Sequence, residues 1–165
     1  MTDDLASRIR TLLAENPRIC GFGCNLREYD RETRTYVPKK RDGFSYDGVE
    51  ITDAQIERLR KMCAFIEANL PHDTRRGGRT LIGSYGFKHV LERNNWTEDN
   101  NRYVSNGEGM VALMLCGYKA RWNKDNTNPN CVFSVRRSKY RDMSENAQRP
   151  NYPKRPSPTQ CVESS

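Results

Sequence analysis

The sequence predicts a mainly α protein of the α+β class, in which three to four helices surround a buried central helix, with a short β hairpin or sheet and extended arms. Residues 110–116 are seven consecutive apolar residues, and a helix that is apolar on every side must be surrounded by protein. Apolar residues recur at helical spacing in segments 3–16, 52–69 and 84–95. Two basic, apolar-poor segments, 18–50 and 137–165, predict the arms.

The N-terminal element, residues 1–17, is expected to be a helix over residues 3–16. Its apolar stripe consists of Leu5, Ile9, Leu12 and Leu13. Asp3 and Asp4 suit the positive N-terminal end of a helix. The helix should end at Asn16, because Pro17 disfavours the helical conformation of the residue before it.

Residues 18–50 are expected to form an extended basic arm that carries a hairpin. Glycines interrupt R-I-C-G-F-G-C-N-L, and the stretch after it is dense in charge, with Tyr29, Tyr36 and Val37 as sparse apolar anchors. The hairpin is predicted at F-S-Y-D-G-V-E-I, because Asp47-Gly48 supplies the positive φ angles of a tight turn. We expect the arm to contact a surface through its anchors.

The helical core domain is expected at residues 51–136, and its first helix covers residues 52–69. Thr52 or Asp53 can cap this helix, and Gln55 or Glu57 lies near the capping-box position. Pro71 should stop it. Its inward-facing residues are Ile56, Leu59, Met62, Cys63, Ile66 and Leu70.

The next helix is expected to begin at Thr80 or Ser84. Its inward-facing residues are Phe87, Val90 and Leu91, and its outward-facing residues are Lys88, Glu92 and Arg93. Ser105 should cap the central helix, residues 106–116. Gly117 should be the left-handed residue that ends it, with Tyr118 making the accompanying apolar contact. Residues 131–135 are apolar and β-branched, and we expect a strand that pairs with residues 34–37 or with the hairpin.

Residues 137–165 are expected to form a Pro-rich basic C-terminal arm. From Arg136 onward, seven Lys/Arg face three Asp/Glu, which is a net charge of +4 within the +7 of the whole chain. The prolines are Pro150, Pro153, Pro156 and Pro158. Such a composition buries too little apolar area to offset the loss of chain entropy. The tail is therefore predicted to be disordered alone and to extend across a partner.

Composition favours an anionic partner. The chain of 165 residues is long enough for one core, its mean hydropathy is −0.93 and its pI is about 9.2. This charge favours a polyanion or an acidic protein surface. No stretch approaches the length of a membrane span, and the start, M-T-D-D-L-A-S, lacks a signal-peptide core. We therefore expect an intracellular, reducing location and six cysteine thiols: Cys20, Cys24, Cys63, Cys116, Cys131 and Cys161.

The sequence contains only weak signs of a metal-binding, nucleophilic or phosphate-binding site. Cys20 and Cys24 lack the second ligand pair that a structural zinc ion needs, and whether they bind metal stays open. Cys116 with His89 is a poor nucleophile pair, because an apolar helix disfavours a thiolate. Neither S-N-G-E-G-M nor R-R-G-G-R is a complete phosphate-binding fingerprint. We expect no cofactor and no enzymatic activity.

Eleven residues are the candidate contacts with nucleic acid or a protein partner: Arg75, Arg76, Arg79, Arg136, Arg137, Lys139, Tyr140, Arg141, Tyr152, Lys154 and Arg155. The first three surround Gly77-Gly78 in a predicted cationic loop that could contact phosphates or be a solvated loop. The tyrosines and arginines of the tail could bind single strands by stacking and charge. They could equally anchor the tail in pockets of another protein. Helix-turn-helix binding is excluded, because the second helix is almost wholly apolar.

The middle of the chain contains S-Y-G-x-K-H at 84–89, Y-V-S-N-G at 103–107, A-L at 112–113, G-Y at 117–118 and N-P-N at 128–130. This pattern resembles small proteins encoded by viruses, including large DNA viruses. The resemblance covers about 50 residues. It implies a viral context, in which a small basic protein with two arms looks like a minor capsid or virion-core component.

The function expected from the sequence is structural. A small core docks, and the arms tie neighbouring subunits together, which adds contact area and avidity. The alternative is a nucleic-acid-binding or packaging protein that acts through the basic tail and the Arg-rich loop. Expected partners are other protein subunits or nucleic acid, and no membrane. The location is intracellular, with a virion as the alternative.

Overall fold

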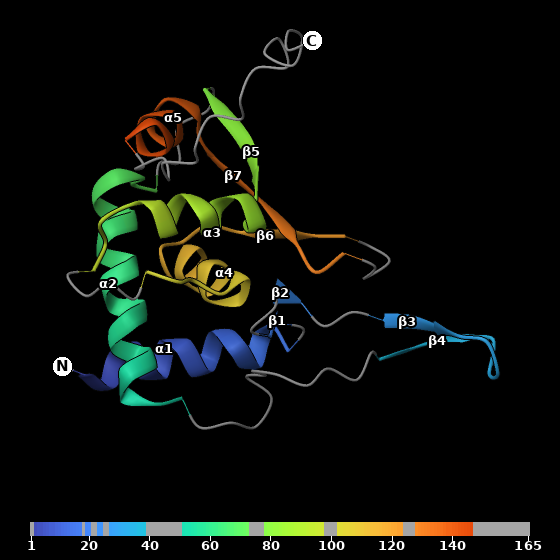
Figure 1. Ribbon diagram of the computed structural model, residues 1–165. Coiled ribbons are helices and arrows are strands. Elements are labelled where there is room, and N and C mark those ends of the chain that lie inside the picture. The colour runs from blue at the N-terminus through green and yellow to red at the C-terminus, as the bar shows by residue number, and fades with distance from the viewer. Residues whose placement is uncertain are drawn as a thin grey trace, which may run out of the picture.

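The computed structural model describes residues 2–17, 19–20, 23–24, 27–38, 51–72, 78–97, 102–123 and 128–146. This part of the chain has five helices, a three-stranded antiparallel sheet and two small hairpins (Figure 1). The helices are α1 (Thr2–Glu15), α2 (Asp53–Asn69), α3 (Ser84–Arg93), α4 (Asn106–Leu115) and α5 (Arg137–Glu145). The strands are β1 (Ile19–Cys20), β2 (Gly23–Cys24), β3 (Arg27–Asp30), β4 (Thr35–Pro38), β5 (Arg79–Gly83), β6 (Ala120–Trp122) and β7 (Cys131–Arg136). The predicted mainly α fold is confirmed.

Helix α4 is the central element, as predicted. It lies between α1 and α3, and α2 crosses beside it (Figure 1). Met110, Val111, Ala112 and Leu113 are fully buried. At its start, the Ser105 hydroxyl accepts a bond from the Glu108 N–H (3.1 Å), and the Glu108 carboxylate accepts one from the Ser105 N–H (2.8 Å). This capping box satisfies two backbone donors that the helix leaves open.

The end of α4 also has the predicted form. Gly117 has a φ of +89°. Its N–H donates to the Met114 carbonyl (3.0 Å), and the Tyr118 N–H donates to the Leu113 carbonyl (3.1 Å). These two bonds define a Schellman motif, which requires a left-handed residue at this position. The Tyr118 side chain is buried, and its hydroxyl donates to the Leu70 carbonyl (2.8 Å), so this turn ties α4 to the end of α2.

Substituting Gly117 by alanine is expected to lower the free energy of unfolding by about 1–2 kcal/mol, because a Cβ is unfavourable at positive φ. The added methyl would lie 3.6 Å from the His72 ring, which is an ordinary contact, so the backbone is the source of the effect. Gly86→Ala is the matched control. Gly86 lies within α3 and an added Cβ meets no atom within 4 Å, so this change should stabilise by about 0.5–1 kcal/mol. Urea unfolding measures both, and a Gly117→Ala protein as stable as wild type would contradict the assignment.

Helices α1 and α2 are close to their predicted bounds. Thr52 caps α2 in a capping box with Gln55. The buried face of α2 consists of Ile56, Leu59, Met62 and Ile66. On α1, Ile9 is fully buried, and the Arg8 guanidinium donates to the Leu115 carbonyl at the end of α4 (2.9 Å). A positive charge at this end of a helix is stabilising, because the last carbonyl groups have no partner within the helix.

The pairing predicted for residues 131–135 is wrong. Strand β7 lies in the middle of the sheet, between β5 and β6, whereas residues 35–37 of the predicted partner 34–37 belong to β4, which pairs with β3. Cys131, Phe133 and Val135 are the buried residues of β7, in strict alternation. One face of β7 is buried against the core, so the strands that pair with it must also lie beside the core. Strand β5 lies there because it leads directly into α3. Thr80 therefore belongs to β5, and α3 begins at the other predicted residue, Ser84.

Parts of both predicted arms are folded. In segment 18–50, β1 pairs with β2 and β3 pairs with β4, and Ile19 is a core residue. The hairpin predicted around Asp47-Gly48 lies outside the described residues. In the C-terminal arm, residues 137–145 form α5, where an extended chain was expected.

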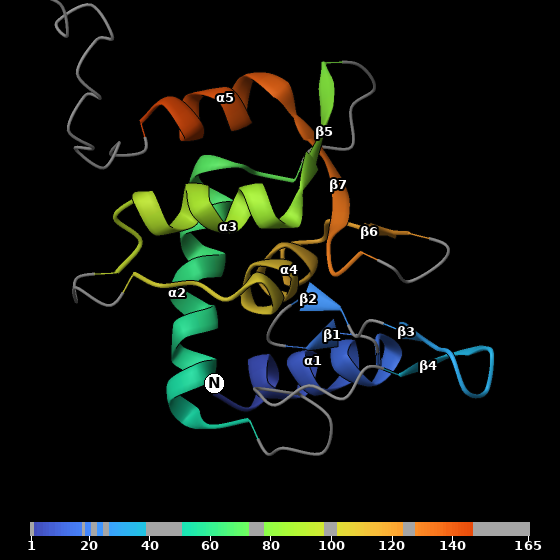
Figure 2. The same cartoon turned by 45° about the vertical axis from the view of Figure 1, so that its right-hand side comes forward.

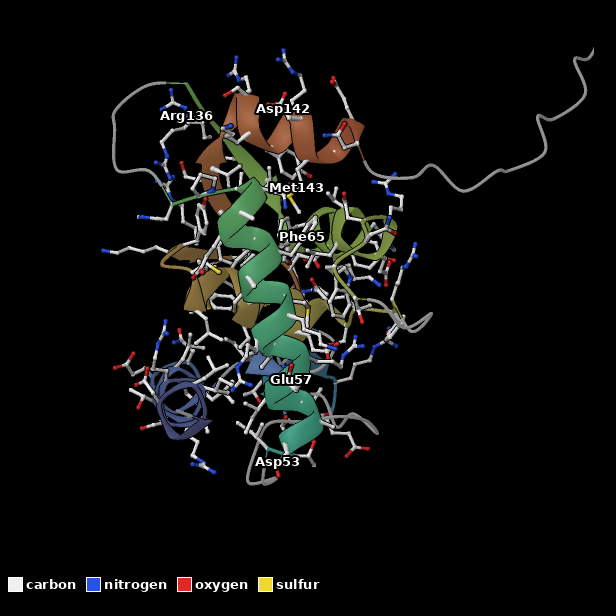
Figure 3. All side chains as sticks on the ribbon, turned by 90° about the vertical axis from the view of Figure 1, so that its left-hand side faces the viewer. Asp53, Glu57, Phe65, Arg136, Asp142 and Met143 are labelled. Atoms are coloured by element: carbon white, nitrogen blue, oxygen red, sulfur yellow. The ribbon has the colours of Figure 1, made fainter. Side chains whose placement is uncertain are left out.

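Helix α5 forms because it has a small apolar stripe that the rest of the tail lacks. Met143 is buried and Tyr140 is half-buried against the core. Figure 3 shows Met143 on the side of α5 that faces Phe65 of α2. The Asn94 carboxamide donates to the Met143 carbonyl (3.3 Å), and the Arg137 N–H donates to the Gly78 carbonyl (2.8 Å). The prolines on which the prediction of disorder depended lie outside the described residues.

Candidate functional site

Five of the candidate contact residues lie at one end of the molecule. Arg79 of β5 is directly opposite Arg136 of β7. The chain continues from Arg136 into α5, which contributes Arg137, Lys139 and Arg141. We call these five residues the basic end. Figure 1 shows α5 and β5 together at the top of the molecule, and Figure 3 shows Arg136 and Asp142 at this end.

The cations of the basic end differ in exposure. Arg79 is half-buried and donates to Ser134, through Nε to the hydroxyl (3.0 Å) and through Nη2 to the carbonyl (2.5 Å). Arg137, Lys139 and Arg141 are exposed. Arg141 lies 3.7 Å from Asp142 and 4.0 Å from Glu145, but these contacts are solvated and contribute little.

Like charges directly opposite each other on neighbouring strands are destabilising. Arg79 and Arg136 occupy such a position. The five cations exceed the two carboxylates of α5, Asp142 and Glu145, by three charges. The basic end is thus a surface of excess positive charge that a bound anion would stabilise.

The remaining candidate contacts are placed differently or lie outside the described residues. Tyr140 is half-buried, and burial raises the pKa of its hydroxyl, an effect that nearby Arg93 opposes. Its side chain packs against the core, so only part of it is accessible for the base stacking or the anchoring in a protein pocket that the sequence left as alternatives. The residues outside the described part are Arg75, Arg76, Tyr152, Lys154 and Arg155.

A second cluster surrounds Lys88, which is buried, although the helical pattern predicted that it would face outward. Its ammonium group donates to the Glu92 carboxylate (3.0 Å) and to the Val104 carbonyl (3.2 Å). It also lies over the rings of Tyr85 and Tyr103, 5.5 Å and 5.0 Å from their centroids. We call Tyr85, Lys88 and Tyr103 the tyrosine platform. Helical periodicity did not reveal this cluster, because segment 102–105, whose Val104 carbonyl accepts the bond from Lys88, is distant from Lys88 in the chain. Figure 2 shows the chain returning beneath α3 before it enters α4.

Glu92 holds this cluster together. Burial opposes ionisation of its carboxyl group, but hydrogen bonds from Lys88, from the Val104 N–H and from His89 outweigh burial and lower its pKa. The His89 Nδ1 lies 2.7 Å from the carboxylate. His89 is therefore engaged with Glu92.

The backbone of Tyr103 is fixed by Arg58. The Arg58 guanidinium donates to the Tyr103 carbonyl and, through Nε, to the Glu108 carboxylate (3.1 Å). It also lies 5.0 Å from the centroid of the Trp96 ring. Glu108 is the residue that completes the capping box of α4. Position 103 is thus tied to the central helix.

Several of the short sequence segments noted above meet in this region. S-Y-G-x-K-H is the start of α3, and Y-V-S-N-G leads into α4. The Asn106 carboxamide donates to the Asn130 side chain (2.9 Å) and lies 3.4 Å from the Pro129 carbonyl, which brings N-P-N to the same place. A cavity of about 450 Å³ lies beside Tyr85 and is also lined by Arg121, Trp122, Asn128 and Asn130.

Cys116, the cysteine considered above as a nucleophile, is poorly suited to that role. Cys63, Cys116 and Cys131 are free thiols, as predicted. A hydrogen bond with Cys63 and burial both raise the pKa of the Cys116 thiol, which disfavours a nucleophilic thiolate. The side chains of Cys20 and Cys24 lie outside the described part. Within that part, no group of three or more His, Cys, Asp or Glu side chains could hold a metal ion.

Comparison with protein-family models, with curated proteins and with solved structures found no match to this chain. The described helices include none that is both long and apolar enough to cross a membrane. The basic end and the tyrosine platform are the two clusters of the described residues that are considered further below.

Proposed function

We propose that the protein binds nucleic acid through its basic end, by contacts with phosphate groups rather than with base sequence. The observation that supports this most strongly is the cross-strand pair of Arg79 and Arg136, which continues into the exposed cations of α5. The pair lies beside the three exposed cations of α5. A phosphate backbone bound across it neutralises several like charges at once and releases condensed counterions.

A charge-matched pair of variants tests this proposal. The α5 variant is Arg137→Gln/Lys139→Gln/Arg141→Gln, which removes three exposed cations of the basic end. The dispersed variant is Arg10→Gln/Arg31→Gln/Lys61→Gln, which removes three exposed cations from α1, from the β3–β4 turn and from α2. Both variants have the same net charge, so a difference between them reports position rather than total charge.

The α5 variant is expected to bind a labelled duplex about 30-fold more weakly than wild type at about 0.1 M salt, and the dispersed variant less than about threefold more weakly. Fluorescence anisotropy measures both affinities, and circular dichroism confirms that both variants are folded. Equal losses in the two variants would show that only net charge matters, and the basic end would then not be the binding surface.

The second candidate function is assembly, in which the protein binds other protein subunits as a minor capsid or virion-core component. Leu81, Tyr85 and Tyr103 are large apolar side chains exposed on the described surface, and such residues are enriched in protein interfaces. The folding of residues 137–145 as α5 removes the first part of the tail from the expected extended arm. Light scattering of the nucleic-acid-free protein tests this candidate: a concentration-dependent increase in mass that Leu81→Asp abolishes would support it, and a monomer at all concentrations would argue against self-assembly.

A further inference from the structure

We infer that the tyrosine platform binds unpaired bases, so that the protein prefers single-stranded nucleic acid. This inference rests on the proposed function and specifies the class of nucleic acid. It is carried by the geometry of Tyr85, Lys88 and Tyr103 together with the cavity beside Tyr85.

Each ring has one face toward the Lys88 ammonium group and is largely open to solvent elsewhere. The Lys88 Nζ lies over both rings, while Tyr85 is 54% and Tyr103 66% exposed. A tyrosine ring contributes a large apolar area when it is buried, but more than half of each of these two residues is exposed. Two rings that are held on one side and open on the other are suited to stacking with flat ligands, and nucleic-acid bases stack on such rings in single-strand-binding proteins.

The platform is held rigidly before any ligand binds. Lys88 is fixed by Glu92 and by the Val104 carbonyl. The Glu92 carboxylate also accepts a bond from the Val104 N–H (3.1 Å), which holds segment 102–105 against α3. The Tyr85 ring packs edge-on against His89, with centroids 4.7 Å apart. A preorganised site loses less conformational entropy on binding, so these contacts favour affinity for bases.

The cavity beside Tyr85 extends the platform. Its volume of about 450 Å³ lies in the range of small-ligand sites. Asn128 and Asn130 line it with polar side chains, and the Asn128 Oδ1 accepts a bond from the Asn130 N–H (2.9 Å), which holds this wall of the cavity in place. Arg121 and Trp122 add a cation and a second aromatic ring to the same cavity. A strand that stacks a base on Tyr85 can therefore place the next nucleotide in the cavity.

The charges around the platform favour a polyanion over an acidic or neutral protein surface. Among the described residues, the carboxylates of Glu92 and Glu108 lie beside the platform and are paired with Lys88 and Arg58, so these two repel a phosphate backbone little. Arg121 is exposed at the cavity. The chain as a whole has a net charge of +7. A strand that stacks here would meet a surface of balanced or positive charge.

The test compares Tyr85→Leu/Tyr103→Leu with wild type on a single-stranded oligonucleotide and on a duplex, at one salt concentration. Leucine keeps an apolar side chain but removes the ring. Because stacking contributes a factor of about 5–150 per base, we expect the single-strand affinity to fall at least tenfold and the duplex affinity to change by less than about twofold. Tyr85→Phe/Tyr103→Phe should retain single-strand binding, and Leu81→Ala, at a similarly exposed apolar residue, should have no effect on either ligand.

The outcomes separate this inference from the proposed function. If wild type binds neither ligand, the proposed function fails and the inference fails with it. If wild type binds both ligands and the leucine variant binds them as wild type does, the inference alone is wrong. Equal losses on both ligands would also overturn the preference for single strands. If the double variant Tyr85→Leu/Tyr103→Leu unfolds, the single variant Tyr103→Leu gives the same comparison, because Tyr103 is the more exposed of the two tyrosines.

Discussion

Replacing Leu113 by alanine is expected to lower the free energy of unfolding by about 3 kcal/mol. Leu113 is fully buried in the central helix, and its carbonyl accepts the bond that closes the turn after α4. Helices α1, α2 and α3 all contact α4. Because the core is held from three sides, a shift of one helix would fill little of the cavity that the missing side chain leaves. Chemical denaturation with two independent probes measures the change.

Leu81→Ala is the matched control, because it deletes the same atoms from a side chain that is 58% exposed. Its expected effect is within about 0.5 kcal/mol. A Leu113→Ala protein that lost no more stability than Leu81→Ala would contradict the placement of α4 at the centre of the core.

Replacing Lys88 by methionine is expected to have a similarly large effect, a loss of about 3 kcal/mol near neutral pH. Methionine keeps an unbranched apolar side chain but leaves Glu92 without its ammonium partner and removes a donor to the Val104 carbonyl. The side chains of Lys88 and Glu92 are only 9% and 19% exposed, so water replaces the lost bonds poorly. The equivalent change at the exposed Lys61 should alter stability by less than about 0.5 kcal/mol.

The pH dependence of this effect identifies its cause. In wild type the pKa of Glu92 is lowered from 4.5, so the carboxylate contributes stability above about pH 4.5 that is lost as the pH falls through its folded pKa. Lys88→Met removes that contribution, and its deficit should therefore shrink in acid. Lys88→Met/Glu92→Gln should recover part of the lost stability near neutral pH. A deficit that does not change with pH and is not reduced in the double variant would assign the effect to packing rather than to the ion pair.

The helices could be predicted because their signals are local. The capping boxes at Thr52 and Ser105 each span four residues, and the Schellman motif at Gly117 depends on neighbouring groups only. The seven-residue apolar run identified the central helix directly. Strand pairing depends on residues far apart in the chain, and the pairing of β5 with β7 joins residues that are 49 to 57 positions apart. The partners predicted for residues 131–135 were wrong for that reason.

The candidate surfaces were predictable in composition but not in arrangement. The cations of the basic end were identified from the sequence, whereas the position of Arg79 opposite Arg136 follows from the β5–β7 register. Lys88 was expected to face solvent because helical periodicity takes no account of a distant segment packing over it. Segments 84–89 and 103–107, which contain the residues of the tyrosine platform, were both singled out in the sequence. That Lys88 lies over the rings of Tyr85 and Tyr103 follows only from the packing of the two segments against each other.

The dependence of nucleic-acid affinity on salt tests the proposed phosphate contacts most directly. Wild type, the α5 variant and the dispersed variant would be titrated with one duplex between about 50 and 200 mM salt. Each neutralised phosphate contributes about −0.9 to the slope of log K against log salt. We expect the slope of the α5 variant to be shallower than that of wild type by about 2–3, and the slope of the dispersed variant to match wild type. Identical slopes for the α5 variant and wild type would contradict binding through the basic end.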